Sequence, residues 1–399
     1  MKVLVLNAGS SSMKFTLFAM ETESPMAKGV VERLGSDSPN LVYKRADGLK
    51  VETPVPVKNH EDAVREIVKM LVDKDKGVIS DLSEIVACGH RVLMGGEKIT
   101  TPKLVNEEVK DVIREYIPLG PLHNPGNLAG IEACEAAIPG VPNVAVFDTE
   151  FHQTMPPEAY LYAIPQKFYR EYGIRKYGFH GTSHRYVTLA SAEYLGKKVE
   201  DVNLITCHLG NGCSIAAIKN GKVIDTTMGL TPLEGLMMGG RSGDMDPAAV
   251  LKLVDLGMST AEVDKLLNKG SGLYGVAGIN SGDMRDLLAA ADAGNADAQL
   301  AIKMFTRRII KYIGAYYVLI GSVDAIVFTG GIGEYSEPTR RDVLNGLGAL
   351  GVKLDSAKND ACRGVPETIS APDSRIRAIV MPTNEELMIA RTVMQTVKL

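Results

Sequence analysis

Two arginines in this chain are placed where they could bind an anion. Arg91 follows the apolar run 85–89 almost directly, and Arg241 lies in a glycine-rich stretch, residues 235–243. A guanidinium suits planar oxyanions because its N–H donors form a fixed fork. Each arginine taken alone could also be a surface or ion-pair residue. Their positions, at a strand end and among glycines, favour binding.

A carboxylate and a histidine extend this set. Asp148 follows the apolar run 144–147, and the carboxyl end of a strand in an α/β sheet is where sites are usually built. Asp148 could also cap a turn. His180 and His184 have a spacing that could suit a metal, but residues 181–183 are typical of a helix N-cap and no third ligand lies nearby in the sequence. We therefore expect no zinc site.

Two glycine-containing turns have the same design. Residues 204–218 consist of an apolar run, the turn Gly210–Gly212 and a second apolar run, and residues 3–18 repeat this order. In an overlay, Asn7 meets His208. Glycine lets backbone N–H groups approach an anion closely. We predict a duplicated domain whose two turns bind phosphates and face one cleft.

The elements that must hold these residues follow from periodicity and from start signals. Apolar spacing predicts helices over 60–74, 297–320 and from 383 to Val397, the last packing on the first domain. Thr383 and Glu386 have the spacing of a capping box, which leaves Glu385 free to face the site.

A short motif occurs twice. Residues 242–245 (SGDM) and 281–284 (SGDM) are identical, and we expect each to start a helix. Ser281 and Asp283 are both good caps for the helix that follows the second copy, so an assignment of residues 283–285 to a nucleotide could instead reflect a helix start and nothing more.

Composition excludes several classes of protein. A chain of 399 residues with 45% hydrophobic and 23% charged residues is typical of a globular protein of two domains. A net charge of −4 gives no basic stripe for nucleic acid, and no apolar run is long enough for a membrane span. Five scattered cysteines without a CxxC pair, and no signal peptide, favour the cytoplasm.

The sequence lacks the motifs of two common nucleotide-binding folds, the P-loop fold and the dinucleotide-binding Rossmann fold. The chain has no G-x-x-x-x-G-K-[ST], and Gly331-Ile332-Gly333 lacks the third glycine of a dinucleotide fingerprint. Glycine turns, arginines and free carboxylates instead suit phosphoryl transfer, which depends on positioning and charge neutralisation.

The chain resembles the acetokinase family of the actin–hexokinase–sugar kinase superfamily. The resemblance runs from the first strand to the last helix, and these segments carry it: 6–14, 89–92, 121–125, 146–149, 151–156, 177–184, 208–212, 239–244, 331–334 and 383–386.

This resemblance implies reversible transfer of the ATP γ-phosphoryl group to acetate, giving acetyl phosphate and ADP by direct in-line transfer. The same-class alternatives are propionate or butyrate as acceptor and pyrophosphate as donor; a non-catalytic actin-like scaffold is the alternative of another class. The resemblance also implies a homodimer and two ribonuclease-H-like α/β domains in each chain. The first domain would consist of residues 1–150 and 385–399, and the second, which would bind the nucleotide, of residues 151–384.

The resemblance also assigns roles to residues. The catalytic set is Arg91, Asp148, His180 and Arg241, with Asp148 expected to orient Arg91 or the water of the metal. The acceptor site is Arg91, Leu93, Leu122, Phe179 and Pro232. The metal, Mg²⁺ with Mn²⁺ as the alternative, is assigned to Asn7 and Glu385. The nucleotide is assigned to Lys14, His208, Leu209, Gly210, Asn211, Gly212, Asp283, Met284, Arg285, Gly331, Ile332, Gly333, Glu334 and Tyr335.

Three positions depart from the family pattern in ways that bear on function. Leu93 stands where relatives usually have valine, and we expect it to narrow the acyl pocket against propionate. Glu150 replaces alanine; it would share a strand face with Asp148 if the strand continued, and would point into solvent if the strand had ended. Tyr335 replaces asparagine in the nucleotide loop and could stack near the base or weaken ATP binding.

Overall fold

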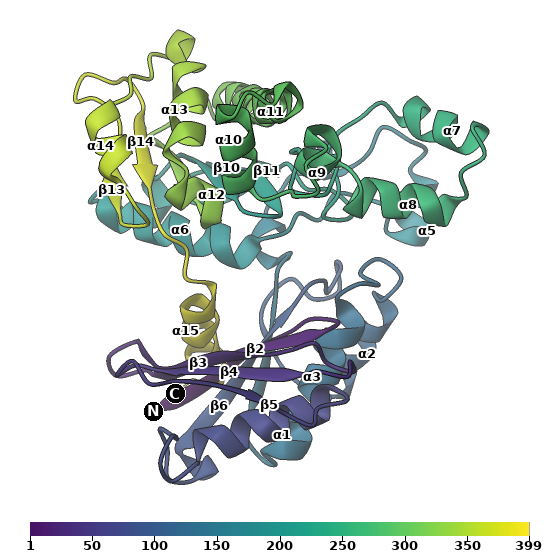
Figure 1. Cartoon of the computed structure of the whole chain (residues 1–399), viewed down its shortest axis with the longest axis vertical. Coiled ribbons are helices and arrows are strands. Elements are labelled where there is room, and N and C mark those ends of the chain that lie inside the picture. The colour runs from purple at the N-terminus through teal and green to yellow at the C-terminus, as the bar shows by residue number, and fades with distance from the viewer. Residues whose placement is uncertain (399) are drawn as a thin grey trace. The chain divides into compact units, whose positions relative to one another are not determined.

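The computed structural model describes residues 1–398; Leu399, the last residue of the predicted first domain, lies outside the described part. The chain divides into two compact units, Met1–Glu150 with Asn384–Leu399, and Phe151–Thr383 (Figure 1). No helix among the described residues is long and apolar enough to cross a bilayer.

The first unit is a mixed sheet with helices on it. The strands are β1 (Lys2–Ala8), β2 (Ser12–Ala19), β3 (Ser24–Glu32), β4 (Asn40–Arg45), β5 (Lys50–Pro54), β6 (Ile85–Val92), β7 (Lys103–Leu104) and β8 (Asn143–Phe147), in the order β5-β4-β3-β2-β1-β6-β8-β7. The helices are α1 (His60–Leu71), α2 (Glu107–Glu115), α3 (Asn124–Ala137) and α15 (Glu385–Val397).

The second unit is built around a smaller mixed sheet. Its strands are β9 (Leu204–Leu209), β10 (Cys213–Lys219), β11 (Lys222–Thr226), β12 (Ala325–Thr329), β13 (Glu367–Thr368) and β14 (Arg377–Val380), in the order β11-β10-β9-β12-β14-β13. The helices are α4 (Pro157–Tyr160), α5 (Lys167–Tyr172), α6 (Gly181–Tyr194), α7 (Pro247–Asp255), α8 (Thr260–Lys269), α9 (Gly272–Ala277), α10 (Met284–Asp292), α11 (Ala296–Ile320), α12 (Gly330–Tyr335), α13 (Glu337–Asn345) and α14 (Ser356–Ala361).

The two units share one strand topology. In the first, β1 is antiparallel to β2 and parallel to β6, which is parallel to β8. In the second, β9 is antiparallel to β10 and parallel to β12, which is parallel to β14. The cores β3-β2-β1-β6-β8 and β11-β10-β9-β12-β14 therefore correspond strand by strand. This confirms the duplicated α/β fold predicted from the two hairpins.

The hairpin turns correspond as well. In the first unit the Gly9 N–H donates to Ser12 O (2.8 Å), and in the second the Gly210 N–H donates to Gly212 O (3.1 Å). Because parallel β6 and β12 lie beside β1 and β9, each turn is next to the carboxyl end of a buried strand. That edge is where polar groups of an α/β sheet collect.

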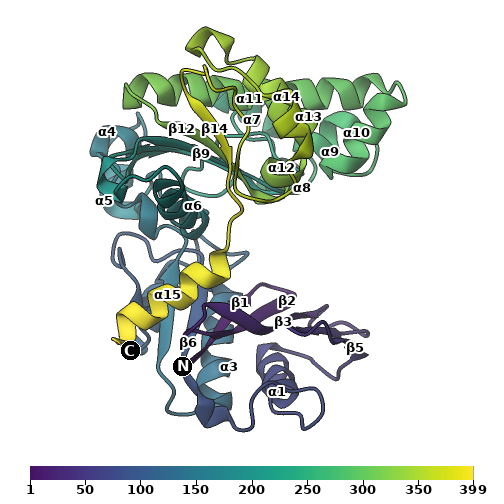
Figure 2. The ribbon, with the colours of Figure 1, turned by 90° about the vertical axis from the view of Figure 1, so that its left-hand side faces the viewer.

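The last helix returns to the sheet of the first unit, as Figure 2 shows for the yellow α15. Gly89 of β6 permits the close approach: a Cβ there would lie 2.7 Å from methyl groups of Ile389 and Val393. Asn384 caps the helix, its Oδ1 accepting the Leu387 N–H (3.1 Å). The predicted capping box at Thr383 is therefore wrong, because the chain enters the helix one residue later.

Two other expectations are corrected at element ends. Strand β8 ends at Phe147, so Asp148 and Glu150 share no strand face; Glu150 begins a 3₁₀ turn and is half-buried, so it does not simply point into solvent. Helix α7 is capped by Asp246, whose side chain accepts the Ala248 N–H (2.9 Å), and not by Asp244 of the repeated motif. Only the second copy of the motif starts a helix directly.

Candidate active site

A cavity of about 180 Å³ lies at the turn of the first hairpin. Its lining residues are Asn7, Ala8, Gly9, Ser12, Lys14, Arg91, Leu93, His123 and Asn127. Asn7 and Lys14 are register partners across the hairpin. The Asn127 amide donates to Ala8 O (2.7 Å) and accepts the Leu93 N–H (2.9 Å), so it joins the turn to the segment after β6.

Arg91 is held by a buried carboxylate. Its Nε donates to Asp148 Oδ1 (3.0 Å) and its Nη2 donates to Oδ2 (2.5 Å). Asp148 is fully buried, whereas the Arg91 side chain is 24% exposed. Burial opposes the charge of Arg91, but Asp148 and Glu385 outweigh it and raise the pKa of the guanidinium. The fork is therefore fixed, charged and partly open to a ligand.

Glu385 brings excess negative charge to the same place. It is the first residue of α15, and its Oε2 lies 4.0 Å from Arg91 Nε. Burial, together with Asp148 and Glu386, raises the pKa of Glu385 to about 7 although Arg91 and Lys14 oppose the shift. A cation bound there would favour the carboxylate form.

These groups fit a divalent metal. Amide and carboxylate oxygens, as Asn7 and Glu385 offer, are ligands for Mg²⁺, and Mn²⁺ accepts the same donors. No group of three or more His, Cys, Asp or Glu side chains among residues 1–398 could hold a metal. Mg²⁺ usually keeps waters and substrate phosphates as its other ligands, so a site with few protein donors suits it.

The second unit has a larger cavity, of about 710 Å³, next to the second hairpin turn. Its lining residues are Gly210, Asn211, Gly282, Asp283, Met284, Arg285, Leu288, Gly331, Ile332, Tyr335, Ser336, Glu337 and Pro338. Ligand pockets of this size accommodate a molecule as large as a nucleotide. Eight of the residues assigned to the nucleotide from the sequence are thus brought together here.

Asp283 caps a helix and also lines the cavity. Its side chain caps α10 by accepting the Arg285 N–H (2.9 Å), and it pairs with the Arg285 guanidinium (2.7 Å). The bonds from Arg285 lower the pKa of Asp283 to about 2. It is a helix cap that also faces the cavity.

Glu334 does not line this cavity. It is 8% exposed, and its Oε1 accepts the N–H groups of Gly330 (2.9 Å) and Thr383 (3.1 Å). The carboxylate therefore fixes the glycine turn after β12 to the segment after β14. His208, Leu209, Gly212 and Gly333 of the assigned set are also absent from the lining.

His180 and Arg241 converge at Gly212 of the hairpin turn. A Cβ on Gly212 would lie 3.4 Å from both Arg241 Nη1 and His180 Nε2. His180 Nδ1 is hydrogen-bonded to Ser214 Oγ (2.8 Å), and its ring stacks on His208 at 4.2 Å. Burial lowers the pKa of Arg241. The glycine turn thus adjoins a nucleotide-sized cavity at Gly210 and Asn211, and a cationic side chain and an imidazole at Gly212.

A second histidine, His184, is linked to His180 through Ser214. His184 is fully buried and is hydrogen-bonded to Thr206 Oγ1 (2.7 Å) and to Ser214 Oγ (2.8 Å). Burial, and then His152 and His208, lower the pKa of His184 strongly. His184 is therefore neutral and fixes the Ser214 hydroxyl that contacts His180.

The residues expected at the acyl group are distributed over both units. In the first, Leu93 is 5% exposed and lines the small cavity, whereas Leu122 is 51% exposed. In the second, Phe179 is buried, and Pro232 O accepts a bond from Arg241 Nη1 (3.4 Å). Lys14, assigned to the nucleotide, belongs to the first unit beside Asn7.

Three residues at these sites were not singled out from the sequence, namely Asn127, His123 and Ser214, and His184 was considered only as a metal ligand. His123 and His184 lie inside segments that carry the family resemblance, so that signal was available. Asn127 and Ser214 act through side-chain bonds between distant segments, and no local pattern marks them.

Two α/β units of one topology, with a nucleotide-sized cavity beside a glycine turn, define the class as a two-domain α/β phosphotransferase. The comparisons identify the family: the model of the acetokinase family matches residues 2–391, and the chain belongs to that family.

Three relatives show how close the similarity is. The chain is 55% identical to the acetate kinase of Oleidesulfovibrio alaskensis, over 100% of both chains. It is similar to the crystal structure of Porphyromonas gingivalis acetate kinase, with a TM-score of 0.95, 46% identity and 99% of each chain covered. A propionate kinase from Francisella tularensis has a TM-score of 0.92 and 40% identity, again over 99% of each chain.

Proposed function

We propose that this chain catalyses the reversible, direct in-line transfer of the γ-phosphoryl group of ATP to acetate, giving acetyl phosphate and ADP. The observation that carries the proposal is the position of Gly212. Gly210 and Asn211 line the 710 Å³ cavity, and Gly212 of the same turn lies next to Arg241 and His180. We therefore place the terminal phosphate of a nucleotide in that cavity at this turn.

The roles of the side chains follow from charge. Arg241 and His180 stabilise the negative charge of the phosphoryl group as it is transferred, since fixed donors are most effective where charge develops. Arg91, oriented by Asp148, binds the carboxylate of acetate. Acetate is already deprotonated at neutral pH, so the forward reaction needs no general base.

Mg²⁺, or Mn²⁺ in its place, is proposed at Asn7 and Glu385, where it would neutralise phosphate charge. The raised pKa of Glu385 supports this assignment. Removing divalent cations with EDTA should abolish acetyl phosphate formation, and added Mg²⁺ should restore it. Glu385→Gln should raise the Mg²⁺ concentration needed for half-maximal rate.

Two further assignments are proposals as well. A homodimer is expected from the family, and light scattering on the eluting protein would test it. A cytoplasmic location is supported by five cysteines that form no disulfide.

Trapping the acyl phosphate with hydroxylamine tests the proposed reaction. Purified protein is incubated with Mg²⁺-ATP and acetate, propionate or butyrate, and in a parallel series with pyrophosphate in place of ATP. We expect the hydroxamate of acetate to form fastest and only with ATP. No hydroxamate from any acid would refute the enzyme proposal and favour a nucleotide-binding scaffold.

A propionate kinase is the second candidate. The 40% identity to the Francisella tularensis propionate kinase supports it. Leu93 argues against propionate as the preferred acceptor, because leucine is larger than the valine usual at this position and leaves less room for a longer acyl chain. A higher kcat/KM for propionate than for acetate would decide for this candidate.

A further inference from the structure

The loop that carries Arg241 has no helix or strand of its own. It runs from the end of β11 at Thr226 to the start of α7 at Pro247. Loops of this length without regular structure are usually functional and need other contacts to hold them. Among the described residues, Arg241 has no carboxylate within ion-pair distance, and its Nη1 donates to Pro232 O (3.4 Å) of the same loop. The position of the Arg241 guanidinium therefore depends on the conformation of this loop.

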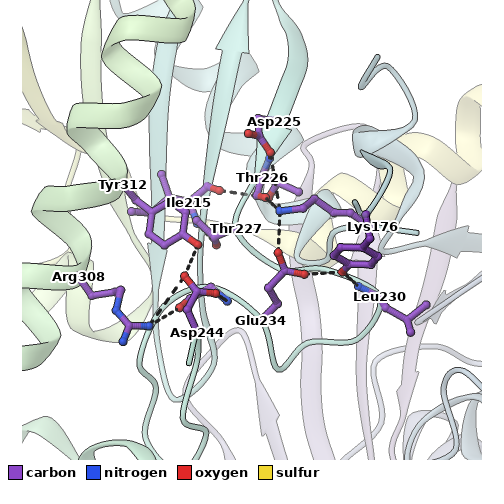
Figure 3. Close-up of polar contacts among 12 residues, drawn as sticks. Lys176, Ile215, Asp225, Thr226, Thr227, Leu230, Glu234, Asp244, Arg308 and Tyr312 are labelled. Carbon is purple, nitrogen blue, oxygen red and sulfur yellow. Dashed lines mark hydrogen bonds and ion pairs between the residues drawn. The ribbon is translucent and has the colours of Figure 1, made fainter. Parts of the chain in front are cut away.

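Asp244 closes this loop on itself, and Figure 3 shows its contacts with Tyr312 and Arg308 of α11. Its Oδ1 accepts the Gly235 N–H (2.7 Å), and its own N–H donates to Gly235 O (3.0 Å). Two groups on α11 complete the closure: the Tyr312 hydroxyl donates to Asp244 Oδ2 (2.5 Å), and Arg308 Nη1 donates to Gly235 O (2.9 Å). Both ends of the segment 235–244 are thus joined to each other and to one long helix.

The glycines of the loop are required by this closure. Gly235 and Gly243 have φ angles of 100° and 65°, in the left-handed region that glycine adopts readily. A Cβ on Gly243 would lie 2.4 Å from Leu236 O. The backbone therefore passes too closely at this point for any other residue.

A second set of polar contacts holds the part of the loop before Gly235. Glu234 Oε1 lies 3.1 Å from Lys176 Nζ, which also donates to Thr226 O (2.8 Å). The Tyr162 hydroxyl donates to Glu234 Oε2 and accepts the Leu230 N–H (2.9 Å). Pro232 is thus held between two fixed points, Leu230 and Glu234.

The repeated motif gives an independent reason to single out Asp244. In the second copy, Asp283 caps the helix that follows it. In the first copy that function belongs to Asp246, so the side chain of Asp244 is available for Gly235 and Tyr312. The aspartate of the same four-residue motif therefore caps a helix in the second copy and closes a loop in the first.

We infer that Asp244, with Tyr312, is a positioning residue for Arg241: it closes the loop 235–244 so that the guanidinium lies at Gly212. This inference rests on the proposed phosphoryl transfer, in which Arg241 contacts the transferred group. A displacement of about 1 Å at a reacting group can cost about 100-fold in rate.

A double-mutant cycle between Asp244 and Arg241 tests this inference. We expect Asp244→Ala to lower kcat about 100-fold with the affinity for ATP unchanged. In an Arg241→Ala background the same substitution should cost little further rate, because two residues that act as one unit are not additive. Asp244→Asn, which keeps the acceptor for Gly235, should recover part of the rate. Equal losses in both backgrounds, or a wild-type rate in Asp244→Ala, would overturn the inference.

Asp246→Ala is the matched control, because it removes an aspartate side chain two residues away that caps α7 and does not touch Gly235. It should leave kcat unchanged. If Asp244→Ala does not fold, Tyr312→Phe takes its place in the cycle with the same expectation of non-additivity, and an additive result contradicts the inference.

Amide hydrogen exchange separates this inference from the proposed function. Residues 235–244 should exchange faster in Asp244→Ala than in Asp246→Ala, whether or not the wild type forms acetyl phosphate. An inactive wild type would refute the proposed function, whereas equal exchange in the two variants would refute the closure by Asp244.

Discussion

At the scale of single residues, the site depends on side chains that fix other side chains. Arg91 is held by Asp148, His180 by Ser214 and His184, and the first hairpin turn by Asn127. Each supporting group is buried and its polar atoms are hydrogen-bonded, which is the condition under which a buried polar group orients its partner.

Asp148→Asn should show this dependence at Arg91. The amide can accept only one of the two guanidinium bonds, so the fork rotates, and we expect kcat to fall about 100-fold. Steady-state rates of acetyl phosphate formation at several Mg²⁺ concentrations are the measurement. An unchanged kcat with a higher Mg²⁺ requirement would instead show that Asp148 acts on the water of the metal.

Leu93→Ala should change the choice of acceptor. The side chain is buried and lines the small cavity, so its removal makes room for an additional methylene. We expect kcat/KM for propionate relative to acetate to rise about tenfold, as one methylene in an apolar pocket is worth roughly 1–3 kcal/mol. If the ratio stays at the wild-type value, Leu93 does not limit the acyl pocket.

His184 predicts a pH dependence of stability. Its pKa is lowered in the folded state, so below its ordinary value of 6.5 the unfolded chain binds a proton that the folded chain does not. Stability is then present above pH 6.5 and is lost as the pH falls below it, by up to about 1.4 kcal/mol per pH unit. Urea unfolding between pH 7.5 and 5.5 should show a steeper loss for the wild type than for His184→Gln; equal slopes would contradict this.

Residue roles were the hardest feature to predict from the sequence. Asp244 and Asp283 stand in identical motifs, yet one closes a loop and the other caps a helix. Glu334 is assigned to the nucleotide, and its carboxylate accepts the backbone N–H groups of Gly330 and Thr383. A motif gives the residue type, whereas the direction of the side chain depends on segments far away in the sequence.

At the scale of elements, the strongly periodic segments were predicted closely. The helix expected over 297–320 is α11 (Ala296–Ile320), and the last helix ends at Val397 as expected. Element starts were less accurate because several caps compete within a few residues, as at Asn384 against Thr383 and at Asp246 against Asp244.

The packing of α15 on β6 can be tested at Gly89. In Gly89→Ala the new methyl group meets Ile389 and Val393, so we expect a loss of about 1–3 kcal/mol in unfolding free energy. Ile389→Ala removes one of the two contacts, and the double variant should be more stable than the sum of the single losses predicts. Denaturant titration is the measurement, and simple additivity would show that the helix does not approach β6 this closely.

Gly89→Ala should also affect catalysis, because α15 begins at Glu385. A displaced helix moves this carboxylate, and the Mg²⁺ concentration for half-maximal rate should rise while the affinity for ATP stays the same.

At the scale of the whole molecule, the duplication of the fold was predictable from the sequence. Which residues of each unit line a cavity was harder to predict. The two hairpins share a pattern of apolar runs and glycine, and five core strands of each sheet, including the hairpin, have the same order. Lys14, which the family resemblance assigns to the nucleotide, belongs to the first unit, and the residues that line the 710 Å³ cavity all belong to the second unit. Sequence pattern describes each hairpin, whereas the cavity is formed by turns that come together only in the fold.

The central claim is that the second unit binds the nucleotide in one place and stabilises the transferred phosphoryl group in another, and that the Gly210–Gly212 turn adjoins both places. Arg241→Ala tests it most directly, through its dissociation constant for ATP and its rate of acetyl phosphate formation. We predict an unchanged dissociation constant and a rate lower by about 100-fold or more. A variant that loses ATP binding in proportion to its rate, or that keeps the wild-type rate, would contradict the claim.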